Sequence, residues 1–287
     1  MPLNANEAAL LYADEYSRMA ETYDRVVAPR FEPIARTVVE LLAPKPGEFI
    51  LDLATGTGLL ACLLAPRVAP QTVVAIDLAD EAIGVASFRA GNAGIRNVRF
   101  EMMDARNIVY PGQRFDKVGS NLGIPNLGYD RTFYEVHRLL KPGGLFVFSE
   151  WDAKPSASFE AFYEVLERHK AATPSKTLAQ LREAVALNRN DPEAKALKDP
   201  KAVARKLESF GFVDVRDIPK TYATHFASVA DLIAFMAAWG WDERELSEMS
   251  PDHRKAFEEE LAARLAGPMG PQGLEETWTI HLTTARA

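Results

Sequence analysis

Short apolar runs alternate with helical patterns in the middle of the chain, from residue 48 to residue 150. The runs are rich in β-branched and aromatic residues, which favour strands, and most of them are separated by stretches with helical spacing. Strands that alternate with helices in this way form βαβ units, which build a parallel sheet covered on both faces. The pattern therefore predicts an α/β fold with strands at residues 49–53, 72–77, 98–104, 115–120 and 145–151.

Helical patterns dominate the rest of the chain. Residues 1–46 predict helices with breaks at Pro29 and Pro33, because proline lacks the backbone N–H that continues a helix. Residues 152–198 are helical and charge-rich, without a strand signal. A third helical stretch is predicted at about residues 219–274. These segments therefore lie outside the alternating α/β pattern and read as additions to it.

Two further strands are predicted near the end of the chain. One spans residues 212–218, and the other spans residues 277–284. In the second, Trp278, Ile280 and Leu282 alternate with polar residues, which is typical of a half-buried strand. Alternation of this kind is common in antiparallel pairs, so we expect the last strand to run antiparallel to its neighbour.

Composition and charge exclude several classes of protein. The 287 residues carry 33 Lys and Arg against 40 Asp and Glu, so the formal net charge is −7 and no nucleic-acid partner is expected. The single cysteine, Cys62, excludes a multi-cysteine metal site, and no metal is predicted. The longest apolar run, residues 59–65, is far too short to cross a membrane. No targeting signal is recognisable, and a cytoplasmic protein is expected.

The most informative stretch is residues 50–61, ILDLATGTGLLA. An apolar strand ends at Asp52, and the chain turns through Gly56 and Gly58 into an apolar helix. Glycine suits this turn because a side chain would keep a ligand away from the backbone. Asp77 lies 19 residues after Gly58, where an acid can accept hydrogen bonds from both hydroxyls of a ribose. We infer that a nucleoside-containing cofactor crosses the carboxyl ends of the strands.

Two cofactors fit a glycine loop of this kind, and Asp52 distinguishes between them. Gly56, Gly58 and Ala61 match the fingerprint of NAD-dependent enzymes. A diphosphate needs bare N–H groups at a helix N-terminus, and the carboxylate of Asp52 would face it unfavourably. The same carboxylate suits an ammonium group, directly or through water. S-adenosylmethionine carries an ammonium, a sulfonium and no phosphate, so the charge favours it over NAD.

Five segments of the α/β region form a recognisable series: LDLATGTG (51–58), AIDLADEAI (75–83), FEMMDARNI (100–108), FDKVGSN (115–121) and LLKPGGLFVFSEW (139–151). In order and spacing they resemble the class I S-adenosylmethionine-dependent methyltransferases. The loop DLATGTG is most similar to the methyltransferases of ubiquinone and menaquinone biosynthesis, over the cofactor half only. The resemblance implies a doubly wound, mostly parallel seven-stranded sheet with an antiparallel last strand, plus helical insertions.

The resemblance also implies roles for residues at the methionine end of the cofactor. Ala54, Gly56 and Gly58 would let the methionine part lie against the backbone. Asn121, at the end of the fourth strand, would lie beside the transferable methyl group. With Asp52 near the ammonium, these residues would surround the reactive end of the cofactor.

At the nucleoside end, the resemblance implies four further contacts. Asp77 would bind the ribose hydroxyls, and Leu78 would pack on the adenine. Asp104 would accept a hydrogen bond from the adenine amino group, and the N–H of Ala105 would meet a ring nitrogen.

One face of the first predicted helix carries Tyr12, Tyr16, Met19, Tyr23 and Val26, which recur every three or four residues. Two interpretations remain open. The face either packs into the core or forms a lid, with Tyr16 or Tyr23 touching the methionine end of the cofactor or the acceptor. Both interpretations place this helix against the rest of the molecule.

The chain divides into four parts on these grounds. Residues 1–46 are expected to form an N-terminal helical lid, and residues 47–151 the cofactor-binding α/β core. Residues 152–198 form a helical insertion. Residues 199–287 complete the core and include the helical insertion at about 219–274.

We predict an S-adenosylmethionine-dependent methyltransferase that acts on oxygen, carbon or nitrogen of a small-molecule acceptor. The segment NLGIPN, from Asn121, lacks the motif with which related enzymes hold planar amino groups, which argues against nucleic-acid or glutamine acceptors. Trp239 and Trp241 either line an apolar pocket or only pack together, and no catalytic residue is recognisable. Two alternatives remain: an NAD(P)-dependent oxidoreductase, or a non-methylating S-adenosylmethionine-binding protein of the same fold. The oligomeric state stays open, a homodimer included.

Overall fold

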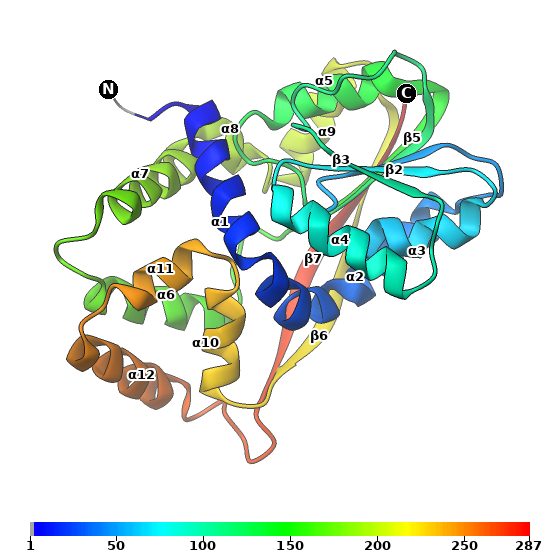
Figure 1. Ribbon diagram of the computed structural model, residues 1–287. Coiled ribbons are helices and arrows are strands. Elements are labelled where there is room, and N and C mark those ends of the chain that lie inside the picture. The colour runs from blue at the N-terminus through cyan, green and yellow to red at the C-terminus, as the bar shows by residue number, and fades with distance from the viewer. Residues whose placement is uncertain (1–2) are drawn as a thin grey trace.

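A seven-stranded sheet forms the centre of the computed structural model, which describes residues 3–287 (Figure 1). Its strands are β1 (Ile50–Leu53), β2 (Val73–Asp77), β3 (Val98–Met102), β4 (Phe115–Asn121), β5 (Leu140–Trp151), β6 (Val213–Phe226) and β7 (Leu274–Arg286). The strand order is β3-β2-β1-β4-β5-β7-β6. Strands β1 to β5 all run parallel to one another. Strand β7 lies between β5 and β6 and is antiparallel to both. The predicted doubly wound, mostly parallel sheet with a reversed last strand is confirmed.

Helices cover both faces of this sheet. Helices α2 (Ala28–Leu42) and α3 (Leu59–Val68) pack on one face. Helices α5 (Tyr129–Leu139) and α9 (Pro200–Ser209) pack on the other. Successive side chains of a strand point to opposite faces, so in β1 Ile50 joins the first apolar cluster and Leu51 the second. Helix α4 (Asp80–Asn92) follows β2 and contacts α1 and β3.

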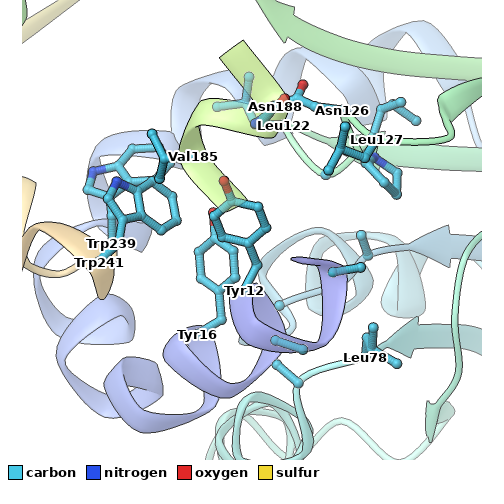
Figure 2. Close-up of a pocket in the computed structure, with 18 of the residues that line it drawn as sticks. Tyr12, Tyr16, Leu78, Leu122, Asn126, Leu127, Val185, Asn188, Trp239 and Trp241 are labelled. Carbon is cyan, nitrogen blue, oxygen red and sulfur yellow. The ribbon is translucent and has the colours of Figure 1, made fainter. Parts of the chain in front are cut away.

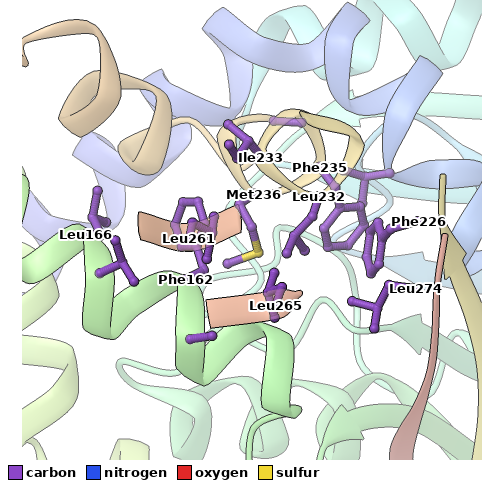
Figure 3. Close-up of a cluster of buried hydrophobic side chains, with 14 of the residues drawn as sticks. Phe162, Leu166, Phe226, Leu232, Ile233, Phe235, Met236, Leu261, Leu265 and Leu274 are labelled. Carbon is purple, nitrogen blue, oxygen red and sulfur yellow. The ribbon is translucent and has the colours of Figure 1, made fainter. Parts of the chain in front are cut away.

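The remaining helices form a separate layer beside the sheet (Figure 1). They are α1 (Ala5–Val26), α6 (Ala157–His169), α7 (Lys176–Asn190), α8 (Pro192–Ala196), α10 (Val229–Ala237), α11 (Trp241–Ser247) and α12 (Pro251–Leu265). Figure 3 shows the apolar cluster that joins this layer to the ends of β6 and β7, with Phe162 beside Leu261 on one side and Phe235 beside Phe226 on the other. Within residues 3–287, no helix combines the length and apolar character needed to span a membrane.

The predicted proline breaks are only partly correct. The chain does break close to Pro29, at Val27, and Pro29 then occupies the first turn of α2. Proline is tolerated there because the first N–H groups of a helix have no partner within the helix. Pro33, however, lies inside α2 and does not end it. The burial of Phe31, Ile34 and neighbouring residues against the sheet and the helical layer offsets the lost hydrogen bond.

Strand β6 is longer than predicted, and the helical insertion is correspondingly shorter. Residues 219–226, assigned to the insertion from sequence, continue β6 and pair with β7. Pro219 does not interrupt the strand because β6 is at the edge of the sheet, where proline is accepted. Tyr222 and Phe226 are buried, which stabilises this extension. The insertion itself consists of α10, α11 and α12.

Candidate active site

A cavity of about 1330 Å³ lies where the carboxyl ends of β1, β2, β4 and β5 meet helices α1, α6, α7 and α11. Pockets for one drug-sized ligand are typically about 300–1,000 Å³, so this cavity has room for two molecules. Ten of the eleven predicted site residues line it: Tyr16, Tyr23, Asp52, Ala54, Gly56, Asp77, Leu78, Asp104, Ala105 and Asn121. The structure therefore brings together residues that the sequence placed on five separate segments.

Asp52 is the most deeply buried acid at the sheet end of the cavity, with an exposed fraction of 1%. Its Oδ2 accepts a hydrogen bond from Thr55 Oγ1 at 2.6 Å, whereas Oδ1 is buried without a partner among residues 3–287. Burial raises the pKa of this carboxyl to about 7, against the lowering effects of the Thr55 hydroxyl and the backbone N–H of Ala61. A cation next to Oδ1 would satisfy the free oxygen and restore the ionised form. The site therefore suits an ammonium group.

Glycine is required at positions 56 and 58 for different structural reasons. Gly56 has a φ of +53° and nothing within 4 Å of the position of a Cβ atom, and it lines the cavity. Gly58 has a φ of +81°, and a Cβ there would lie 2.8 Å from Ala86 Cβ of α4. Gly58 is buried and is absent from the cavity lining. The prediction that Gly58 faces the ligand is therefore not supported, since its role is the close packing of α3 against α4.

Asp77 fixes the glycine loop as well as facing the cavity. Its Oδ2 accepts a hydrogen bond from the N–H of Gly56 at 2.7 Å, and its Oδ1 accepts one from Ala79 at 2.9 Å. Burial raises the pKa of this carboxyl despite the lowering effects of the backbone N–H groups of Ala79, Gly56 and Leu78. Each carboxylate oxygen can accept a second hydrogen bond, which leaves capacity for two hydroxyl groups. Leu78 follows directly and presents an apolar side chain to the same cavity (Figure 2).

Asp104 has a partner that the sequence did not reveal. Its carboxylate binds the guanidinium of Arg106, with Oδ1 to Nε at 3.0 Å and Oδ2 to Nη2 at 2.7 Å. Partial burial would raise the pKa of Asp104, but the hydrogen bonds from Arg106 outweigh it and lower the pKa. Asp104 and Arg106 line the cavity together with the buried Ala105.

The loop after β4 closes against the loop after β1. The Oδ1 of Asn121 accepts a hydrogen bond from Ser149 Oγ at 3.1 Å, which fixes the amide at the end of the strand. A Cβ at Gly123 would lie 2.8 Å from the Cβ of Ala54, so the two loops touch at a point where only glycine fits. This contact holds Asn121 beside the residues that follow β1.

The tyrosines of α1 satisfy both interpretations of that helix. Tyr23 packs edge-on against Phe31 and Trp239, with ring centroids 6.4 Å apart in each case. Tyr16 packs against Tyr23 and Trp241 and lines the cavity. Burial raises the pKa of both hydroxyl groups, so both are neutral near pH 7. Helix α1 thus packs into the molecule and covers the cavity at the same time.

The other end of the cavity is aromatic and lies among the helices. Figure 2 shows Tyr12 and Tyr16 projecting from α1 towards Trp239 and Trp241, with Val185 of α7 nearby. Tyr12 and Trp241 meet edge-on, with centroids 5.4 Å apart. The two tryptophans therefore do line an apolar pocket, one of the two roles that the sequence left open.

Sequence reasoning missed two polar residues at this aromatic end, Asp242 and Tyr163. Asp242 is buried, and its Oδ2 accepts a hydrogen bond from the hydroxyl of Tyr163 at 3.0 Å. The pair comes from α11 and α6, which are 79 residues apart in sequence, so no local pattern indicates it. The only signal is an acid placed directly after the aromatic segment WGW, residues 239–241.

The charges around the glycine loop fit S-adenosylmethionine better than a dinucleotide. Asp52 and Asp77 both face the sheet end of the cavity. Arg89, the cation next to Thr57 of the loop, is already paired with Asp24. A diphosphate would meet two acids here, whereas an ammonium group and ribose hydroxyls would meet acceptors. These hydrogen-bond acceptors therefore fit S-adenosylmethionine, the cofactor that the sequence indicated.

Comparisons with known proteins agree with this geometry. Residues 50–144 match the family described as "Methyltransferase domain". The chain is 27% identical to nocamycin O-methyltransferase of Saccharothrix syringae over 94% of this chain and 96% of that protein. It is 37% identical to a demethylmenaquinone methyltransferase of Thermus thermophilus, over 45% of this chain and 59% of that protein. The YcgJ protein of Bacillus subtilis shares the fold, with a TM-score of 0.56 and 17% identity over 88% of this chain and 97% of that one. These matches do not support the oxidoreductase alternative.

Proposed function

The chain belongs to the class I S-adenosylmethionine-dependent methyltransferases, and we propose that it methylates a small, partly apolar molecule bound at the aromatic end of the cavity. The observation that carries the proposal is the size and division of the cavity. Its volume of about 1330 Å³ exceeds what one ligand needs, and its two ends differ in chemistry. The sheet end has acids and backbone N–H groups, whereas the helical end combines tyrosine and tryptophan with charged side chains such as Arg182 and Glu245.

At the sheet end, we assign the cofactor contacts residue by residue. Asp52 would pair with the ammonium group, and its buried Oδ1 without a partner supports this. Asp77 would accept hydrogen bonds from the ribose hydroxyls, and Leu78 would pack against the adenine. The N–H of Ala105 would meet a ring nitrogen. Because Asp104 is already paired with Arg106, we propose that it shares its remaining lone pairs with the adenine amino group.

At the methionine end, Ala54 and Gly56 would allow the ligand to lie against the backbone. Asn121 would lie beside the methyl group. When bound, S-adenosylmethionine supplies a methyl group attached to a positively charged sulfur, so the leaving group is already part of the cofactor. The protein's task is to align the acceptor and exclude water, and alignment alone can lower a barrier by about 7–11 kcal/mol.

The helical parts of the chain would provide the acceptor pocket. Residues 1–46, 152–198 and the helices of the last insertion contribute Tyr12, Val185 and Trp241 to the lining. The names of the two curated relatives describe a small-molecule O-methyltransferase and a quinone-precursor methyltransferase. The first spans nearly the whole chain, including these helical parts, whereas the second matches only about half of it. We therefore favour oxygen as the methylated atom.

The test is acceptor-dependent turnover. The protein is incubated with isotope-labelled S-adenosylmethionine and a panel of small phenols, enols and amines, and S-adenosylhomocysteine and labelled products are measured by mass spectrometry. We expect S-adenosylhomocysteine to form only with suitable acceptors. Asp77→Ala should weaken cofactor binding about 100-fold through lost hydrogen bonds, whereas Asp80→Ala, an exposed neighbour, should not. Firm cofactor binding without turnover of any acceptor would contradict the proposal.

A further inference from the structure

Asp242 is a buried acid that the proposed cofactor contacts do not use. It lies in the first turn of α11, between Trp241 and the rest of the helix, with an exposed fraction of 1%. It lines the cavity at the aromatic end, together with Trp239 and Trp241. Burying a carboxyl group in apolar surroundings is costly, so a position like this is rarely filled by an acid for packing alone.

The surroundings of Asp242 leave it short of partners. Besides burial, two groups change the pKa of its carboxyl: the hydroxyl of Tyr163, which donates a hydrogen bond, and the carboxylate of Glu245, which repels it. Neither is a cation. Glu245 is itself held by Arg182 of α7 at 2.7 Å, so this arginine is committed elsewhere. The carboxyl group therefore keeps most of its hydrogen-bonding capacity.

Tyr163 places this carboxyl at the cavity surface. Although its hydroxyl is bound to Asp242, the tyrosine retains an exposed fraction of 39%, and it lines the same cavity. A molecule that enters the aromatic end would therefore lie against Tyr163 and next to the acid that Tyr163 orients. The pair resembles a base held in position by a neighbouring hydroxyl group.

Tyr16 links this pair to the cofactor end. Its hydroxyl is close enough to Asp77 and Asp242 that both acids raise its pKa, as do Tyr12 and Tyr23. The acid assigned to the ribose and the acid at the aromatic end thus lie on two sides of one tyrosine. A flat molecule that lies against the tryptophans and Tyr16 would reach the cofactor end and Asp242 together.

We propose that Asp242 binds a hydroxyl group of the acceptor and takes up its proton during methyl transfer, with Tyr163 as the positioning residue. The acceptor class is a planar hydroxylated aromatic or enolic molecule, which suits the aromatic lining of Trp239, Trp241 and Tyr12. The step balances: the new O–C bond forms as the C–S bond breaks, the electron pair of that bond stays on sulfur, and the hydroxyl proton moves to the Asp242 carboxylate. This inference rests on the proposed function.

The chemistry of the carboxyl group supports the role. Burial raises the pKa of Asp242 to about 8, which brings it closer to that of a phenol and makes it a stronger base than an exposed acid. Three titratable groups face it from the packed elements: Tyr163 of α6, Tyr16 of α1 and Glu245 of α11. The two tyrosines stay neutral in this range, so Asp242 is the group that gains and loses a proton.

The test compares two ligands that differ by one methyl group. The full-length protein saturated with S-adenosylhomocysteine is titrated by calorimetry with 2-naphthol and with its methyl ether, 2-methoxynaphthalene, near pH 8. Wild type should prefer the naphthol about tenfold or more, because only the naphthol donates a hydrogen bond to the carboxylate. The preference should increase from pH 6 to pH 9 as the carboxyl ionises around its pKa of about 8.

Asp242→Asn should abolish this preference, and Tyr163→Phe should reduce it. Asp252→Asn, an exposed aspartate on α12, is the matched control and should behave as wild type. All variants should bind S-adenosylhomocysteine normally, which shows that they are folded. No preference in wild type, or an equal preference in Asp242→Asn, overturns the inference. Since no turnover is needed, a preference that depends on Asp242 without methylation of any acceptor would contradict the proposed function alone.

Discussion

Asp52, Asp77 and Asp242 are three acids of one cavity with three different surroundings. Asp77 accepts two backbone hydrogen bonds, Asp242 accepts one from a tyrosine, and Asp52 keeps one buried oxygen without a partner among residues 3–287. Burial raises the pKa of all three. We propose that each acid meets a different ligand group: an ammonium, a pair of hydroxyls, and a hydroxyl that loses its proton.

Replacing Asp52 tests its proposed pairing with the ammonium group of the cofactor. Asp52→Asn should weaken S-adenosylhomocysteine binding by roughly 10- to 100-fold, because the ammonium loses its charged partner at the buried Oδ1. Binding of 5′-methylthioadenosine, which lacks the amino-acid part, should hardly change. Calorimetry with both ligands measures the two effects. If both ligands lose the same affinity, Asp52 acts on the loop as a whole and not on the ammonium.

The buried carboxyl of Asp242 should make the stability of the protein depend on pH. The pKa of Asp242 is about 8 in the folded protein against 3.8 as its ordinary value, so its contribution to stability is largest at low pH and is lost as pH rises through this window. Relative to Asp242→Asn, wild type should lose up to about 1.4 kcal/mol of unfolding free energy per pH unit between these values. Urea unfolding of both proteins from pH 5 to pH 8 tests this. Parallel curves would show that Asp242 does not titrate in this range.

At the scale of elements, the turn from β1 into α3 shows what a glycine pattern can and cannot predict. The strand, the turn and the helix all follow from residues 50–61, because an apolar run, two glycines and a second apolar run allow little else. The same residues do not show why glycine is needed at each of the two positions. Gly58 is required by Ala86 and Phe100, which approach it only in the folded protein.

This distinction gives a paired prediction. Gly58→Ala should destabilise the protein by about 2–4 kcal/mol, since it combines an unfavourable positive φ with a clash against α4. Gly56→Ala, where a Cβ meets nothing, should cost only about 1–2 kcal/mol but should impair cofactor binding, because its methyl group enters the cavity. Thermal unfolding and calorimetry separate the two effects. Equal losses of stability would contradict the packing role of Gly58.

In two other elements, the tertiary structure overrides the local effect of a proline. Pro33 signals a helix break, yet α2 continues because Phe31 and Ile34 are buried. Pro219 signals the end of a strand, yet β6 continues because it is an edge strand. A single sequence does not show which strand is at the edge or which helix face is covered, so both boundaries depended on the fold.

For the whole molecule, the sequence predicts the cofactor end of the cavity far better than the acceptor end. Cofactor residues follow strand ends, and parallel strands bring their carboxyl ends to one edge of the sheet. The acceptor end is built by helices that are distant in sequence: Tyr12 from α1, Tyr163 from α6, Val185 from α7 and Asp242 from α11. Their meeting depends on helix packing, such as the ion pairs of Arg244 with the buried Glu15 and of Arg18 with Glu243, which tie α1 to α11.

In the function proposed here, one cavity binds the cofactor at the sheet edge, and its helical end stays free for the acceptor. Hydrogen exchange measured by mass spectrometry, with and without S-adenosylhomocysteine, tests it directly. We expect slower exchange in the segments around residues 54–57, 77–79, 104–106 and 121–123, which line the sheet end. Protection confined to other segments, with these four unchanged, would contradict it.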